Sequence, residues 1–258
     1  MVELIDTHTH LYDSPFEEDF DKVVERARQQ GVSKIVLPAV DSTCHREMLQ
    51  CSDKLPGFAY PAIGLHPTSV KSNWREELDF VTSHINERKF CAIGEIGIDG
   101  YWSKEYLAEQ ITVFKEQIEL ASRSSLPVIV HMRDSTEEIF KVLDNCRHFP
   151  LRGVFHAWSG SIESYERLKR YGTFLFGIGG VVTYKSSKLP DVVAKMDLND
   201  IVLETDSPWL TPAPHRGRRN EPSYVKIVAE QIARIKRISL EEVAEHTTQN
   251  AIRMFNLN

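Results

Sequence analysis

Short apolar runs alternate with segments of helical periodicity along the whole chain, and this alternation restricts the fold more than any other feature. Such runs, apolar almost throughout, are typical of parallel strands buried on both faces. The first is Leu4-Ile5, and the others are expected at residues 34–40, 58–64, 90–93, 127–130, 153–155, 173–176 and 201–203. Eight strand–helix units predict an α/β fold, a closed (β/α)8 TIM barrel, as one domain over residues 1–258. An open doubly wound sheet is the alternative.

Helices are expected between and after these runs. The longest, at residues 104–124, carries apolar side chains at helical spacing, so one of its sides is predicted to be buried. Ser135-x-x-Glu138 and Ser239-x-x-Glu242 have the pattern of capping boxes. The other helices are expected at residues 17–30, 44–53, 75–87, 161–170, 223–236 and 240–255.

Composition excludes several classes of protein. The start of the chain lacks a basic, apolar signal segment, and no apolar stretch reaches the length of a membrane span, so we expect a cytoplasmic protein without membrane contact. The formal net charge of −6 argues against a broad nucleic-acid-binding surface but permits a small basic mouth around one site. The four cysteines show no Cys-x-x-Cys pairing and are predicted to be reduced packing residues. No obligate protein partner is inferred.

Asp6-Thr7-His8-Thr9-His10 directly follows the first apolar run. Alternate side chains of a strand point to the same face, so His8 and His10 are expected to project together. Two adjacent imidazoles can hold a divalent metal, which requires further ligands from elsewhere in the chain. A pair of surface histidines at a strand end is the alternative.

Four further residues that can bind metal follow other predicted strands: Glu95, His131, His156 and Asp206. In a barrel, the carboxyl ends of the strands surround a single mouth, where catalytic groups of this fold are found. Taken singly, each residue has a structural interpretation as a buried histidine, a helix cap or a turn acceptor. Taken together, they predict one metal centre.

These residues lie in motifs that resemble those of the TatD family, within the amidohydrolase superfamily of metal-dependent TIM barrels. The motifs are His8/His10, GEIGID at 94–99, LPVIVHMRD at 126–134, VFHAWSG at 154–160, LETDSP at 203–208 and RNEP at 219–222. Members of that family are described as metal-dependent hydrolases, several of them deoxyribonucleases. The resemblance implies two divalent metal ions, one held by His8, His10, Glu95 and Asp206. Glu95 would bridge to a second ion held by His131 and His156.

The chemistry of these residue types agrees with that implication. Two metals bridged by a carboxylate can share a water and convert it to hydroxide near neutral pH. Two dications outweigh the two carboxylates, so the pocket favours an anionic substrate such as a phosphodiester. Glu95 and Asp206 are the catalytic candidates, and Asp206 is expected to take the proton of the attacking water. The histidines suit Zn, Mn, Fe, Co or Ni, whereas some nucleases of the family work with Mg.

Five further residues are candidates for substrate binding. Arg218 and Arg219 lie in a basic loop after the eighth strand, and such loops frequently hold phosphate in this fold, although a solvated loop with salt bridges is the alternative. Arg133 could reach phosphate or pair with its neighbour Asp134. Trp158 could stack on a base or pack the barrel mouth. His66 could contact substrate or make a hydrogen bond behind the metal ligands.

The leading hypothesis is therefore a metal-dependent hydrolase of phosphodiesters, a deoxyribonuclease that acts on DNA ends. A second hypothesis keeps the metals and changes the bond to a carboxyl ester, lactone or amide, including the ester of an aminoacyl-tRNA. A third is a non-catalytic binding module whose metals only stabilise the mouth. Nucleophilic catalysis by the protein is disfavoured, because no serine has the Gly-x-Ser-x-Gly context and no cysteine has an obvious base.

Overall fold

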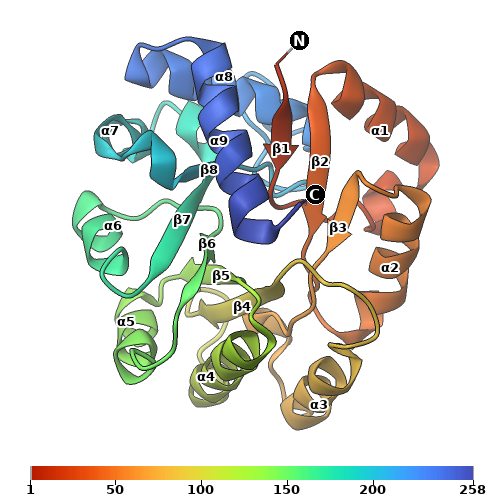
Figure 1. The fold of residues 1–258 in the computed structure, drawn as a ribbon, viewed down its shortest axis with the longest axis vertical. Coiled ribbons are helices and arrows are strands. Elements are labelled where there is room, and N and C mark those ends of the chain that lie inside the picture. Colours follow the sequence, from red (N-terminus) through yellow and green to blue (C-terminus); the bar gives the residue numbers. More distant parts are fainter. Residues whose placement is uncertain (1, 258) are drawn as a thin grey trace.

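The computed structural model describes residues 2–257, in which eight parallel strands alternate with helices (Figure 1). The strands are β1 (Leu4–Asp6), β2 (Val32–Leu37), β3 (Ala59–Pro61), β4 (Ile93–Asp99), β5 (Val128–Arg133), β6 (Arg152–Phe155), β7 (Thr173–Ile178) and β8 (Ile201–Leu203). The α-helices are α1 (Phe20–Gln29), α2 (His45–Lys54), α3 (Trp74–His84), α4 (Leu107–Ser124), α5 (Thr136–Asn145), α6 (Ile162–Leu168), α7 (Leu189–Lys195), α8 (Val225–Lys236) and α9 (Leu240–Phe255).

Two runs of paired strands, β1-β2-β3 and β4 to β8, close into a barrel through contacts at both of their edges. Beyond β1, the amide of Asp206 donates to the carbonyl of His8 at 2.9 Å, and Thr9 forms a parallel bridge with Ser207. Beyond β3, Ile63 forms a parallel bridge with Ile93 of β4. The predicted TIM barrel is therefore confirmed, and its closure places the ends of β1 and β8 side by side.

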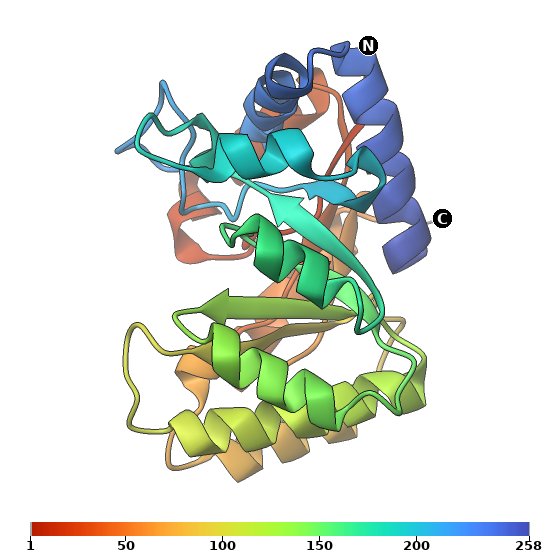
Figure 2. The ribbon, with the colours of Figure 1, turned by 90° about the vertical axis from the view of Figure 1, so that its left-hand side faces the viewer.

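The interior of the barrel is an apolar layer to which all eight strands or their immediate flanks contribute. Its members are Ile5, Val36, Ala62, Ala92, Ile129, Val154, Leu175 and Val202, and Met254 and Phe255 of α9 pack beneath them. Helix α9 thus covers one end of the barrel, in front of the strands in Figure 1. In Figure 2 the arrow of β5 points away from α9, so the carboxyl ends of the strands lie at the opposite end, the mouth.

Several local expectations need correction. Strands β4 and β5 continue past the predicted ends at residues 93 and 130, so Glu95 and His131 lie within strands rather than after them. The short helix α7 was not expected, and the first helix begins at Phe20 after a 3-10 turn. The predicted capping box at Ser135 is wrong, because its hydroxyl donates to the carbonyl of Ile98 at 2.7 Å. At Ser239 the side chain does accept from the amide of Glu242, as predicted.

Two expectations from composition can be compared with the structure. All four cysteines are free thiols, as predicted. Within residues 2–257, no helix combines the length and the apolar character that a membrane crossing requires.

Candidate metal centre

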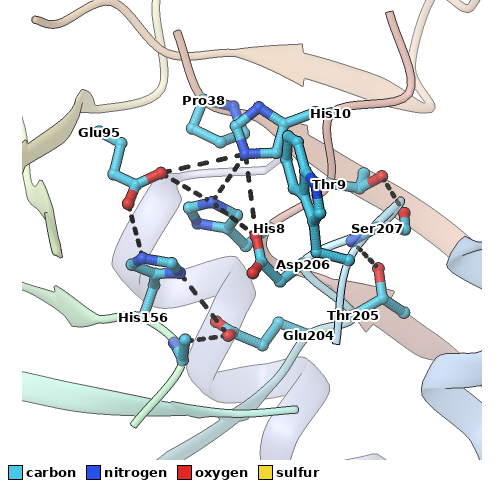
Figure 3. A network of polar contacts seen from close by, with 12 residues as sticks. His8, Thr9, His10, Pro38, Glu95, His156, Glu204, Thr205, Asp206 and Ser207 are labelled. Carbon is cyan, nitrogen blue, oxygen red and sulfur yellow. Dashed lines mark hydrogen bonds and ion pairs between the residues drawn. The ribbon is translucent and has the colours of Figure 1, made fainter. Parts of the chain in front are cut away.

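Four candidate ligands meet just beyond β1. The Nε2 atoms of His8 and His10 lie 3.3 Å apart, so the two imidazoles project together as the alternation of a strand predicts. Oε2 of Glu95 lies 3.0 Å from Nε2 of His8 and 4.0 Å from Nε2 of His10. Oδ1 of Asp206 lies 3.7 Å and 3.8 Å from the same two nitrogens. Figure 3 shows these four side chains pointing toward one another.

The second candidate group surrounds the other oxygen of Glu95. Its Oε1 lies 2.6 Å from Nε2 of His156 and 2.8 Å from Nδ1 of His131. Nε2 of His66 lies 3.2 Å from the same oxygen, so His66 joins this group rather than standing apart from it. The two oxygens of one carboxylate therefore face two separate sets of imidazole nitrogens, which is the arrangement expected of a bridging ligand.

Glu95 is buried, with 2% of its surface exposed. Burial alone would disfavour its charge, but the surrounding His156, His66 and His8 outweigh burial and hold its pKa well below the usual range. Burial also opposes the charge of His8, yet Glu95 raises the pKa of that imidazole to about 9. Without metal, the cluster is thus held together by one ionised carboxylate and the histidines around it.

Hydrogen bonds fix the orientation of two candidate ligands. Oδ2 of Asp99 lies 2.8 Å from Nε2 of His131, which leaves Nδ1 to face Glu95. Nδ1 of His10 lies 2.8 Å from the Tyr12 hydroxyl, which donates to the carbonyl of Pro38. Partners of this kind orient metal-binding imidazoles and are common behind metal sites.

Glu204 lies close to His8 and His156, whose rings stack with their centres 3.9 Å apart. It is fully buried, and its Oε1 accepts from the amide of Ala157 at 2.6 Å (Figure 3). Its Oε2, together with Nδ1 of His8 and Nδ1 of His156, has no hydrogen-bond partner among residues 2–257. Burial raises the pKa of this carboxyl to about 8. Small shifts would let Glu204 accept a hydrogen bond from either imidazole and so direct the opposite nitrogens into the cluster.

The imidazole nitrogens and carboxylate oxygens gathered here could hold metal cations. Three groups of buried or half-buried side chains have their ligand atoms within 4.8 Å of one another: His8 with His10 and Glu95, His66 with Glu95 and His131, and His8 with His156 and Glu204. Imidazole and carboxylate are the usual ligands of Zn and its neighbours in the first transition series. The unpartnered nitrogens behind the cluster also fit this assignment, because a metal on Nε2 fixes the proton on Nδ1.

Asp206 stands at the end of β8, with 14% of its side chain exposed. Burial raises the pKa of this carboxyl to about 7. It is the most accessible carboxylate of the first group, since Glu95 is 2% exposed. It can therefore face both the metal position and a water from the mouth.

Two of the predicted substrate-binding residues lie in different environments: Arg133 is exposed and Trp158 is buried. Arg133 is exposed, and its guanidinium lies over the ring of Tyr101 at 3.8 Å without an ion pair to Asp134 or any other residue of the described chain. Trp158 is only 2% exposed and packs edge-on against Phe176. Burial thus contradicts stacking of Trp158 on a base, and the contact with Phe176 agrees with the alternative, packing of the barrel mouth.

The basic loop after β8 is mostly structural. Arg219 forms a bidentate pair with Asp19, with both N–O distances at 2.8 Å, and the proposed phosphate contact of Arg219 is wrong for this reason. Asn220 is buried and donates to the carbonyls of Thr205 and Trp209. The guanidinium of Arg218 has no ion pair within residues 2–257, and no contact joins it to the metal cluster.

Glu204 and Asp99 lie within the motifs LETDSP and GEIGID, but their functional role was not predicted from the sequence. The sequence does contain a signal for each. Glu204 lies two positions before the candidate ligand Asp206, and Asp99 lies four positions after Glu95 on the same strand. The side chain of Thr9, between His8 and His10 in sequence, lies away from the cluster, where its hydroxyl lies 2.6 Å from that of Ser207.

The fold and the site together define a class: an α/β barrel with a histidine–carboxylate metal cluster at the carboxyl ends of its strands. The sequence model of the family described as TatD related DNase matches residues 5–256. The chain therefore belongs to the TatD family, whose members include metal-dependent hydrolases.

Individual relatives agree with this assignment. The metal-dependent hydrolase YabD of Bacillus subtilis is 40% identical over 99% of this chain and 100% of its own length. Human deoxyribonuclease TATDN3 is 35% identical over 98% of this chain and 95% of its own length. The crystal structure of the TatD homologue YJJV from Escherichia coli K12 superposes with a TM-score of 0.91, at 32% identity and 98% coverage of both chains.

Proposed function

We propose that this protein is a phosphodiesterase that hydrolyses DNA from its ends, using two divalent metal ions. The observation that carries the proposal is Glu95, whose Oε1 and Oε2 face separate groups of imidazoles at 2.6 Å and 3.0 Å. Support for DNA as substrate comes from the human relative that is named a deoxyribonuclease. The alternative, hydrolysis of a carboxyl ester, has no observation of its own in the structure.

The residues of the chain fall into two proposed ligand sets. His8, His10 and Asp206 would hold one ion, His131 and His156 the other, and Glu95 would bridge them. When bound, such ions would lower the pKa of a shared water and neutralise charge that develops on the phosphate. Histidine-rich sets favour Zn, Mn, Fe, Co or Ni over Mg.

Other side chains would handle the proton and the phosphate. Asp206 is proposed to accept the proton of the attacking water and return it to the leaving oxygen, because it is the accessible carboxylate of the cluster. Arg133 is proposed to bind a non-bridging phosphate oxygen, since its guanidinium is exposed and has no anionic partner in residues 2–257. Glu204 and Asp99 would keep the ligand imidazoles in position.

The test is an assay of metal-depleted protein to which single divalent ions are returned. Single-stranded DNA, a p-nitrophenyl phosphodiester, an aminoacyl ester and a lactone are compared as substrates. We expect metal-dependent hydrolysis of both phosphodiesters and its loss in His156→Ala. The control His246→Ala should retain full activity, because His246 bonds Asn199 just before β8, at the α9 end of the barrel. Hydrolysis of only the carboxyl ester or the lactone would contradict the proposal.

A further inference from the structure

Three large hydrophobic side chains are exposed within residues 2–257, and all three lie on loops of the barrel mouth. Tyr101 is 53% exposed and Trp102 is 70% exposed, and both follow the end of β4 at Asp99. Trp209 is 51% exposed and follows β8 by way of Asp206. Exposed large apolar side chains that gather at one face of a protein often mark a binding site, and the rings of Tyr101 and Trp102 are in direct contact, with their centres 5.1 Å apart.

Trp209 is held rigidly beside the first candidate metal group. Its amide donates to the carbonyl of Asp206 at 2.8 Å, and its own carbonyl accepts from the buried Asn220 at 2.6 Å. Its ring lies 5.0 Å from that of His10, in an edge-to-face arrangement. The indole therefore stands next to a candidate ligand with half of its surface open to a substrate.

Tyr101 and Trp102 are tied to the second candidate group. Their amides donate to Oδ1 of Asp99 at 2.9 Å and 3.0 Å, while Oδ2 of the same carboxylate bonds His131 at 2.8 Å. One side chain thus positions both a candidate ligand and the aromatic loop. Any group bound on that loop is held at a fixed place relative to His131.

The surroundings of Trp102 supply a cavity and a positive charge. A cavity of about 370 Å³ beside Trp102 is lined in part by the apolar Pro67, Val70 and Tyr106 and by the charged Lys71, Asp99 and Glu105. Its volume lies in the range of pockets that hold small organic groups. The guanidinium of Arg133 lies 3.8 Å from the ring centre of Tyr101 and 5.4 Å from that of Trp102. A planar apolar group could stack on the ring of Trp102, and an adjacent anion could pair with the guanidinium of Arg133.

We propose that these aromatic side chains form two stacking subsites for unpaired nucleobases, with Trp209 beside the first metal position and Trp102 with Tyr101 beside the second. The inference rests on the proposed phosphodiesterase function and names the form of its substrate. Every nucleobase has a flat face that stacks on an aromatic ring without regard to sequence. With a formal net charge of −6, the protein offers no broad attraction for phosphates outside the metal centre, so stacking would add affinity that the rest of the surface does not supply.

A consequence is that the site selects frayed or single-stranded ends. A base within a duplex is already stacked on both faces and is not free to lie on Trp209 or Trp102. The aromatic loops would then hold one base on each side of the cluster while the intervening phosphate approaches Arg133.

The test compares two single-stranded oligonucleotides, one with normal bases and one with abasic residues at both ends. Trp209→Ala and Trp102→Ala are each expected to raise the KM for the normal strand about 5-fold or more, the effect of losing one base–aromatic contact. The KM for the abasic strand should stay at the wild-type value, and kcat should change less than KM. Trp209→Phe keeps an aromatic ring and should retain most of the preference for the normal strand.

A matched control is Phe149→Ala, an aromatic replacement just before β6, at the α9 end of the barrel, which should alter neither KM. If both tryptophan variants keep the wild-type ratio of KM between normal and abasic strands, the stacking subsites do not exist. If wild-type protein with its metals cleaves neither strand, the proposed function itself is wrong, and the subsites with it. A loss of melting temperature with unchanged KM ratios would show a structural role only, and would also overturn the inference.

Discussion

Gly177 of β7 faces Glu204 so closely that even a methyl group cannot be added without moving the carboxylate. A Cβ at this position would lie 2.0 Å from Oε2 of Glu204 and 2.7 Å from its Cδ. Carbon atoms in contact lie about 3.5 Å apart, so Glu204 would have to retreat by roughly 1 Å. It has little room, because it is fully buried and its Oε1 is held at 2.6 Å by the amide of Ala157.

The expected cost of Gly177→Ala has two parts. Overpacking of a buried site costs about 1–3 kcal/mol, which in a chain of this size lowers the melting temperature by about 2–10 °C. Oε1 of Glu204 lies 3.8 Å from Nδ1 of His156, so the shift is also transmitted to a candidate ligand. Disturbance of groups that orient metal ligands typically lowers metal affinity by about 10- to 100-fold.

Gly179→Ala is the matched control. Its Cβ would lie 3.6 Å from Cγ of Glu204, an ordinary contact, and its φ of −116° is accessible to alanine. Melting temperature and Mn²⁺ affinity are measured for both variants, the latter by competition with a chelator. Adding Glu204→Asp to Gly177→Ala shortens the displaced side chain and should recover much of the lost melting temperature. If Gly177→Ala binds metal like the wild type, or if both alanine variants behave alike, the role assigned to Glu204 is refuted.

Three further predictions concern the cluster and the loop after β8. Asp206→Asn should lower kcat by about 100-fold or more while the far-ultraviolet spectrum stays unchanged; retention of a tenth of the activity would exclude it as proton acceptor. His131→Ala and His156→Ala should each lower bound metal from two ions toward one, as measured by elemental analysis after dialysis, and two retained ions would contradict the ligand sets. Arg219→Ala should lower stability by about 1 kcal/mol without changing the KM for DNA, because it loses a partly buried ion pair rather than a substrate contact. Hydrogen bonds from Arg219 and, more weakly, from Arg26 lower the pKa of Asp19 to about 2, so the part of the stabilisation that Arg219 supplies should be complete above about pH 4 and disappear toward pH 2. A difference in melting temperature between variant and wild type that is constant down to pH 2 would refute it.

Local patterns were sufficient to predict the barrel. The apolar run at 201–203 coincides with β8, and the repeated strand–helix order left few other folds. The helix α7 was missed because seven residues provide less than two full turns of periodicity. The ends of β4 and β5 were missed because Gly94 and Glu95 in β4, and His131 and Arg133 in β5, interrupt the apolar pattern while the strands continue.

Within the site, the sequence predicted which side chains meet but not which atoms they present. The alternation of side chains along an extended segment predicted that His8 and His10, just beyond β1, share one face. The bonds of Asp99 to His131 and of Glu204 to Ala157 instead depend on the registers of distant strands. For Trp158 and Arg219 the sequence left two interpretations open, because the choice depends on partners elsewhere in the chain, Phe176 and Asp19. A tryptophan or arginine in a motif gives no indication of whether it is exposed.

The central claim is that Glu95 bridges two metal ions with the ligand sets described here. The direct measurement is anomalous diffraction from crystals grown with Mn²⁺. The account predicts two peaks on opposite sides of the Glu95 carboxylate, one among His8, His10 and Asp206 and the other beside His131 and His156. A single peak, or a pair of peaks that Glu95 does not join, would contradict the claim.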